Sequence, residues 1–520
     1  MSKPLDTGAV RALRTAADLG VELCLANPGT TELAFVEALD AVPEIRSVLG
    51  LFEGVCTGAA DGYGRMAGKP ALSLLHLGPG FANGIANLHN ARRARSPIVN
   101  LIGDQASWHL QHDAPLTSDI GSLASPVSHW MRTSGSPRHL DRDLRDAIDA
   151  ANGPPAGVST LIVPADHQFR SANEGNAVGL SVPFDAPASR ALDVDRVAER
   201  VRAGENIALL LGGNALHHDG VRAAGRIAQR FGAKCIAETF PARWERGTGL
   251  PVVDRLPYFP EQAQEALAKF DLVITAGART PVAFFGYEGI ESVLVEDERI
   301  ACLAEPFEDA AAALIVLADA LGARTGDTPD APPPAAPDLS AALDPMTIGT
   351  VVAALLPENA IVMEEGATSS LPFYLLSNGA APHTVMTLTG GAIGQGMPCA
   401  TGAALACPDR KVVNLQADGS GMYTLQSLWT QAREGLDVTT LVCSNRAYRI
   451  LQVEFGRTGN IEPGPKARRL TNLDEPELDW VALARGMGVP GVRIETTEAF
   501  FRELPRAIAE PGPQLLELMI

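Results

Sequence analysis

Short apolar runs alternate with amphipathic helical patterns along the whole 520-residue chain. This alternation is typical of parallel β-sheets covered by helices, because parallel strands need long crossover connections that are usually helical. The sequence therefore predicts an α/β protein built from doubly wound parallel sheets. The runs expected to be strands are 21–27, 47–52, 71–77, 96–104, 159–166, 206–215, 233–239, 271–278, 292–298, 359–366, 383–388, 410–419, 437–445 and 513–520.

Two stretches rich in proline and small residues interrupt this alternation. They cover residues 171–189 and 324–344, and their proline content disfavours a packed helix or strand. We therefore expect two linkers and three doubly wound domains, at 1–170, 190–323 and 345–520.

The composition narrows the classes of partner. The chain carries 42 basic and 61 acidic residues, a net charge of −19, which argues against a nucleic acid and means that any phosphate must be bound locally. Its seven cysteines form no Cys-x-x-Cys pair and lie in apolar surroundings, as in a reducing, cytoplasmic compartment. The amino terminus lacks the apolar core of a signal peptide and no run is long enough to span a membrane, so we expect no membrane anchor.

The segment 411–451 carries the strongest chemical signal. An apolar run ends at Asp418, Gly419-Ser420-Gly421 lead into a helical pattern, and a second apolar run ends at Asn445. Ligands bind at the carboxyl ends of parallel strands, and helix amino termini suit phosphates. The Asp and Asn oxygens could share a hard cation. The alternative is that both short strings are ordinary turns.

The string DGSGMYTLQSLWTQAREGLDVTTLVCSN (418–445) resembles the signature of thiamine-diphosphate-dependent enzymes, in particular the acetolactate synthase and benzoylformate decarboxylase branch. It departs from that signature at Ala417, where the family usually has Gly, and at Ser444, where it has Asn. Neither change removes a metal ligand. The resemblance implies that Mg²⁺ is held by the side chains of Asp418 and Asn445 and the carbonyl of Ala447, and that the diphosphate is lined by Gly419, Ser420 and Tyr448.

A second part of such a site is expected near the amino terminus. In these enzymes a glutamate bonds a nitrogen of the coenzyme's aminopyrimidine ring and so promotes loss of the thiazolium proton. Glu53 follows an apolar run and precedes a Gly/Ala-rich helical pattern, and 47–84 is similar to the family's pyrimidine-binding segment. Alone, Glu53 would be read as a solvated carboxylate at a helix start. Its combination with the 411–451 segment favours the catalytic interpretation.

A glycine-rich segment, 387–406, precedes the strand that ends at Asp418. By the resemblance, the carbonyl of Gly391 meets the coenzyme's amino group and Ile393 holds the coenzyme bent, which brings base and reacting carbon together. The alternative is a plain glycine-rich connector. Thr368 is placed like a further phosphate or substrate contact, and Ile450 is expected to face the acyl group.

Three residues are expected to lie near the substrate. The string NPGTTE (27–32) resembles the family's substrate loop, so Thr30 is expected to meet the substrate carboxylate. His76 matches a histidine that benzoylformate decarboxylase-like enzymes use for proton transfer, although a histidine at a strand end can also serve packing alone. His112 is expected as a further polar group of the active site.

These observations predict a thiamine-diphosphate- and Mg²⁺-dependent 2-oxo acid decarboxylase or carboligase, a lyase or transferase. Family precedent implies active sites shared between chains of a homodimer or homotetramer, and substrates that are a 2-oxo acid with, for carboligation, an aldehyde or ketone acceptor. The rival interpretations are a non-catalytic coenzyme-binding paralogue and a flavin-dependent oxidase. Residues 190–323 lack recognisable flavin-contacting segments, so FAD is not expected. The second active-site histidine of benzoylformate decarboxylase has no obvious match in 277–289.

Overall fold

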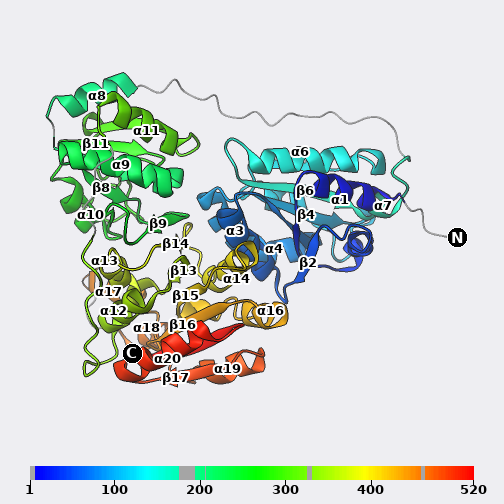
Figure 1. The fold of residues 1–520 in the computed structure, drawn as a ribbon. Helices are drawn as coiled ribbons and strands as arrows, with labels where there is room; N and C mark the ends of the chain where they lie inside the picture. Colours follow the sequence, from blue (N-terminus) through cyan, green and yellow to red (C-terminus); the bar gives the residue numbers. More distant parts are fainter. Residues whose placement is uncertain (1–5, 175–193, 205, 325–330, 458, 460–462) are drawn as a thin grey trace. The chain divides into compact units, whose positions relative to one another are not determined.

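The computed structural model describes residues 6–174, 194–204, 206–324, 331–457, 459 and 463–520. These residues form an α/β fold with three sheets dominated by parallel strands, as the sequence predicts (Figure 1). They divide into two compact units, 1–187 with 388–493 and 507–517, and 188–387 with 494–506 and 518–520. Most of the expected linker 171–189, and residues 325–330 of the other, lie outside the described residues. No helix in the described ranges has the length and apolarity needed to cross a membrane.

The first sheet belongs to the first unit and has six parallel strands in the order β2-β1-β3-β4-β6-β5. Five of these strands coincide with predicted apolar runs, whereas β5 was not predicted. The strands are β1 (Leu23–Asn27), β2 (Arg46–Leu49), β3 (Ala71–His76), β4 (Ile98–Asp104), β5 (Trp130–Thr133) and β6 (Val158–Pro164).

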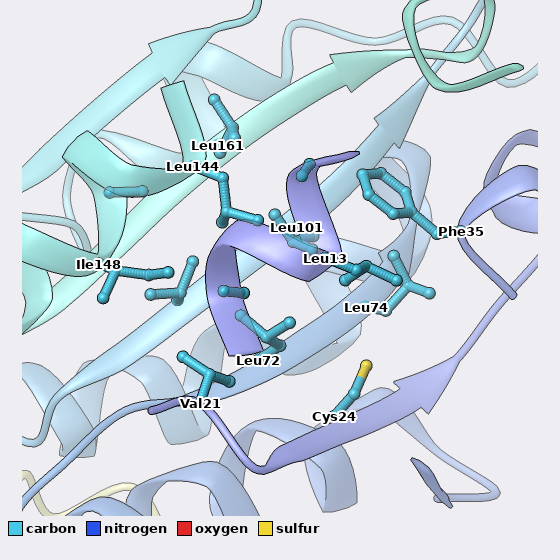
Figure 2. Packing of buried hydrophobic residues seen from close by; sticks show 14 of the residues in the cluster. Leu13, Val21, Cys24, Phe35, Leu72, Leu74, Leu101, Leu144, Ile148 and Leu161 are labelled. Atoms are coloured by element: carbon cyan, nitrogen blue, oxygen red, sulfur yellow. The ribbon is translucent and has the colours of Figure 1, made fainter. Parts of the chain in front are cut away.

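Helices cover both faces of this sheet, and each face has its own apolar core. On one face Leu13, Phe35 and Leu144 pack against Leu72 and Leu101 of the strands (Figure 2). Helices α1 (Gly8–Asp18), α2 (Leu33–Leu39), α6 (Leu140–Asn152) and α7 (Ala165–Phe169) lie on or beside that face, and α3 (Glu53–Ala67), α4 (Leu77–Ala94) and α5 (Ile120–Ala124) cover the other.

The carboxyl-terminal part of the first unit contains strands in the order β17-β18-β16-β15, of which β15 and β16 are parallel neighbours. Its core includes Met397, Leu428 and Trp480. The elements are α14 (Gly396–Ala406), β15 (Val412–Ala417), α15 (Asp418–Gly421), α16 (Ser427–Glu434), β16 (Val438–Ser444), α17 (Arg449–Arg457), α18 (Pro465–Thr471), α19 (Trp480–Gly486), β17 (Gly491–Ile494) and β18 (Gln514–Met519).

Within the first unit, α3 and α14 pack backbone against backbone. A Cβ on Gly62 of α3 would lie 2.0 Å from the carbonyl oxygen of Cys399, and one on Gly402 of α14 would lie 1.8 Å from that of Ala59. Glycine is therefore required at both positions, because any side chain would push the helices apart. This close contact brings residues 388–395, which precede α14, against α3 and α4.

The second unit contains a parallel sheet in the order β10-β8-β7-β11-β12, and a group in which β9 pairs antiparallel with β14, itself parallel to β13. The expected strand at 292–298 is wrong: this acidic segment makes only a bridge between Val282 and Val293, and the edge strand is β12. The elements are α8 (Val194–Arg202), β7 (Ile207–Leu211), α9 (His218–Phe231), β8 (Lys234–Ala237), β9 (Trp244–Arg246), β10 (Asp254–Arg255), α10 (Pro260–Leu267), β11 (Leu272–Ala276), β12 (Ile300–Ala304), α11 (Ala310–Ala320), α12 (Pro345–Leu355), β13 (Ala360–Glu365), α13 (Leu371–Leu376), β14 (His383–Thr387) and α20 (Thr497–Ala509), of which 497–506 belong to this unit.

Candidate functional site

Glu53 is the first residue of α3, directly after the extended residue Phe52, and its side chain is half-buried. The Nδ2 of Asn83, on α4, donates a hydrogen bond of 2.9 Å to its Oε2. A Cβ on Gly80 would lie 3.0 Å from its Oε1, so the glycine leaves space beside that oxygen. A carboxyl group fixed by one amide and open at its other oxygen can exchange a proton with a bound molecule.

Asp418 lies at the carboxyl end of β15 and begins α15, with only 1% of its surface exposed. Its Oδ1 accepts a hydrogen bond from the backbone N–H of Gly419 (2.8 Å), and its Oδ2 accepts one from that of Arg446 (2.6 Å). Burial raises the pKa of Asp418 to about 6, against the opposing effect of these backbone donors. A cation beside the carboxylate would offset this cost of burial.

Asn445 follows β16, the parallel neighbour of β15, so it lies at the same edge of the sheet as Asp418. Its Oδ1 accepts a hydrogen bond of 3.0 Å from the N–H of Ala447, which holds the oxygen in place. The Asp418 carboxylate, the Asn445 amide and the Ala447 carbonyl all offer oxygen atoms, the type of donor that Mg²⁺ prefers. No cluster of three or more His, Cys, Asp or Glu side chains suited to a metal occurs among the described residues, and a site with one carboxylate is consistent with that.

The turn after Asp418 is close-packed. A Cβ on Gly419 would lie 2.6 Å from a ring carbon of Tyr448, so the tyrosine ring covers this backbone. Burial, with the neighbouring Tyr423 as a further cause, raises the pKa of Tyr448. The hydroxyl of Ser420 accepts a bond from Gln416 (2.7 Å) and is 6% exposed, so this side chain is engaged within the turn.

Gly391 and Ile393 lie in the segment before α14. Gly391 has a φ of +77°, a left-handed conformation that favours glycine. The neighbouring backbone is held by α4: the Nδ2 of Asn90 donates to the carbonyl of Ala392 (2.7 Å), and the ring of His89 bonds the carbonyl of Gly390 (3.0 Å).

His76 ends β3 and contacts a buried carboxylate. Its Nδ1 lies 2.8 Å from the Oε2 of Glu32, which is fully buried and also accepts a bond from the N–H of Gly29 (2.8 Å). The hydroxyl of Thr31 lies 3.2 Å from the same Nδ1. Thr30, predicted to meet the substrate carboxylate, precedes Thr31 and is exposed.

The other predicted residues, His112, Ile450 and Thr368, take no part in the hydrogen bonds described above. His112 is exposed at the end of a short 3₁₀ helix (Leu110–His112), where its ring is 5.7 Å from that of His109. Ile450 is half-buried on α17. Thr368 belongs to the second unit, in a 3₁₀ helix at Ala367–Ser369.

Three residues that the sequence reasoning did not single out hold parts of this site. Glu32 stands inside the string NPGTTE, and Asn83 stands inside the segment 47–84 that resembles the family's pyrimidine-binding segment, so a signal for both was present. Asn90 gave no such signal, because its partner, Ala392, lies 302 residues away.

Comparisons with known proteins agree with one another. The N-terminal domain of the thiamine pyrophosphate enzymes, a domain that binds thiamine pyrophosphate (thiamine diphosphate), matches residues 6–123, and the C-terminal binding domain matches residues 370–518. A putative acetolactate synthase large subunit of Mycobacterium tuberculosis is 48% identical over 516 residues, 99% of both chains. Benzoylformate decarboxylase of Pseudomonas aeruginosa is 29% identical over 96% of both. The structure of a thiamine diphosphate-dependent 4-hydroxybenzoylformate decarboxylase of Rhodococcus jostii has a TM-score of 0.83 and 26% identity, covering 98% of both chains.

Proposed function

Because this chain belongs to the thiamine pyrophosphate enzymes and is an enzyme of the acetolactate synthase and benzoylformate decarboxylase type, we propose that it decarboxylates a 2-oxo acid with thiamine diphosphate and Mg²⁺. The product is released as an aldehyde or joined to an aldehyde or ketone acceptor. The observation that carries this proposal is the buried carboxylate of Asp418. Its Oδ2 accepts a hydrogen bond from the N–H of Arg446, the residue after Asn445, at the carboxyl ends of the parallel strands β15 and β16.

The family resemblance supports the proposed metal and diphosphate contacts. Asp418, Asn445 and the carbonyl of Ala447 hold Mg²⁺, which neutralises the diphosphate in a chain of net charge −19 without a basic patch. Gly419 and Ser420 line the diphosphate at the start of α15, where the ring of Tyr448 lies against Gly419. Thr368 is proposed as a further phosphate or substrate contact.

When bound, the coenzyme would supply a nucleophilic carbon and an electron sink for the loss of CO₂ from the 2-oxo acid. Glu53 exchanges a proton with the pyrimidine ring, and Asn83 keeps its carboxyl group in place. The carbonyl of Gly391 and the side chain of Ile393 orient the ring, which places the base near the reacting carbon.

On the substrate side, His76 is proposed to move a proton near the reacting carbon. Glu32 engages Nδ1 and so leaves Nε2 as the nitrogen that faces a substrate. Thr30, His112 and Ile450 are proposed as substrate contacts. Pyruvate, an aromatic 2-oxo acid and a longer aliphatic one remain alternatives.

We also propose that the sites are shared between chains, so that Glu53 of one chain serves Asp418 of another in a homodimer or homotetramer. The family resemblance supports this arrangement. FAD is not required for this chemistry.

A screen of CO₂ release over a panel of 2-oxo acids, with coenzyme, Mg²⁺ and aldehyde acceptors, tests the proposal when products are identified by mass spectrometry. Glu53→Gln should keep coenzyme binding and lower kcat by at least about 10²-fold, since positioned proton transfer contributes that much or more. Glu44→Gln, at an exposed position, is the control. Coenzyme binding without CO₂ release from any acid would support the non-catalytic rival, and normal turnover by Glu53→Gln would refute the assigned role.

A further inference from the structure

The backbone of Ala392 is held on both sides by one buried side chain. The N–H of Ala392 donates to Oδ1 of Asn90 (3.1 Å), and Nδ2 of Asn90 donates to the carbonyl of Ala392 (2.7 Å). Asn90 lies on α4 and is 0% exposed. A side-chain amide that pairs with both backbone groups of one residue fixes its position and orientation, as a strand neighbour would.

The same segment, 389–395, is tied to the helices at both ends. Nη2 of Arg65 donates to the hydroxyl of Thr389 (2.9 Å), and Nε2 of Gln395 donates to Asp61. Asp61 and Arg65 form a buried ion pair on α3, with 2.7 Å between Oδ2 and Nη2. These ties place the whole segment on α3 and α4 of its own chain.

The middle of the segment packs tightly against α4. A Cβ on Gly390 would lie 2.4 Å from Oδ1 of Asn90 and 2.8 Å from the ring of His89. His89 in turn bonds the carbonyl of Gly390 at 3.0 Å. The backbone therefore lies directly on the surface of α4, and a shift of the Asn90 amide would move it.

We propose that Asn90 is a positioning residue that sets the conformation in which Gly391 and Ile393 meet the coenzyme. This rests on the proposed function, because it assumes that these two residues contact the coenzyme. Ala392 stands between them, so any displacement of its peptide groups moves the Gly391 carbonyl and the Ile393 side chain together. In the shared arrangement proposed above, α3 and α4 thus contribute to two coenzyme sites: they carry Glu53 and Asn83 for the site of another chain and hold the segment with Gly391 and Ile393 for the site of their own.

The test compares Asn90→Ala with Asn100→Ala in the full-length protein. Asn100 is the matched control: it is also 0% exposed and makes side-chain hydrogen bonds to Ser73 and Thr160, but it lies in the core of the first sheet. Hydrogen exchange of the peptide that covers 388–395 is measured without coenzyme. Loss of a buried hydrogen bond predicts about 10- to 100-fold faster exchange in Asn90→Ala only.

The second measurement is coenzyme affinity with Mg²⁺, together with the kinetics of CO₂ release. Asn90→Ala should bind thiamine diphosphate about 10- to 100-fold more weakly than the wild type. It should also lower kcat at saturating coenzyme, because a displacement of about 1 Å can lower a rate by about 10²-fold. The KM for the 2-oxo acid should change less than about 3-fold. His89→Ala, which removes one half-buried contact, should change affinity in the same direction by a smaller factor.

The proposal is overturned if Asn90→Ala matches Asn100→Ala in exchange of 388–395 or in coenzyme affinity. If Asn90→Ala does not fold, unchanged affinity in His89→Ala overturns it instead. A wild-type protein that binds no coenzyme refutes the proposed function, and with it the positioning role. In that case the exchange experiment still reports whether Asn90 holds the segment, so the two failures are distinguishable.

Discussion

Gly62, in the middle of α3, has no room for a side chain. A Cβ there would lie 2.0 Å from the carbonyl oxygen of Cys399 in α14. The obstructing atom is backbone, so no rotamer change relieves the clash, and the two helices would have to separate by about 1.4 Å to restore an ordinary contact.

We expect Gly62→Ala to destabilise the protein. Overpacking of a core costs about 1–3 kcal/mol, and alanine returns about 0.5–1 kcal/mol through its higher helix propensity. These ranges leave a net loss of about 0–2.5 kcal/mol. Because the obstructing atom is backbone, we expect the upper part of that range, about 1–2.5 kcal/mol, and a fall of about 2–10 °C in the Tm of the first unfolding transition. Coenzyme affinity should fall as well, because α14 follows directly on the segment with Gly391 and Ile393.

The control is the same substitution where the chain offers space. Gly456 is exposed in α17, and a Cβ there would have no neighbour within 4 Å. Gly456→Ala should therefore leave the Tm unchanged or raise it. Differential scanning calorimetry of both coenzyme-free variants gives the comparison. A Gly62→Ala protein as stable as Gly456→Ala would refute the idea that α3 and α14 touch through their backbones.

Two further predictions concern buried charge. Asp61→Asn leaves the buried guanidinium of Arg65 without its counter-ion and should lower the free energy of unfolding by about 3–5 kcal/mol. Lys69→Ala, which removes an exposed ion pair, should lower it by less than about 1 kcal/mol. Equal shifts in Tm for the two variants would contradict this expectation. Burial, with Arg246 as the second cause, lowers the pKa of His383 from 6.5 to about 3, so below pH 6.5 the unfolded chain binds a proton that the folded chain does not. As the pH falls from 6.5 to 4, His383 should therefore lower the free energy of unfolding by up to about 1.4 kcal/mol per pH unit. The free energy of unfolding, measured by denaturation across that range, should depend less on pH in His383→Phe than in the wild type. Equal pH dependence in the two proteins would contradict this role of His383.

Most strands that the sequence predicted have apolar runs buried on both faces, as β4 does, whereas β2 was predicted although its first two residues are exposed. The missed strand β5 has four residues and only its first is buried, so it lacks the continuous apolar run that reveals an interior strand. β9 has three residues and pairs antiparallel with β14, whereas the sequence predicted parallel sheets only.

The candidate site was predictable where side chains follow strands. Asp418 and Asn445 lie at one edge because β15 and β16 are parallel neighbours, and that neighbourhood follows from their order in the chain. Asn90 was not predictable, because a polar residue within a helix gives no sign of which distant backbone it meets. Its contact with Ala392 depends on the close approach of α3 and α14, which only the packed structure reveals.

The two departures from the family signature, Ala417 and Ser444, bear on the idea of a decayed, non-catalytic paralogue. Ala417 has φ −96° and ψ 149°, an ordinary extended conformation, so glycine is not required there. Ser444 is buried at the end of β16, and its hydroxyl has no hydrogen-bond partner among the described residues. Both bonds to the Asp418 carboxylate come from the backbone of Gly419 and Arg446, which neither departure alters. The departures therefore leave the proposed metal-holding geometry intact, which favours the catalytic interpretation.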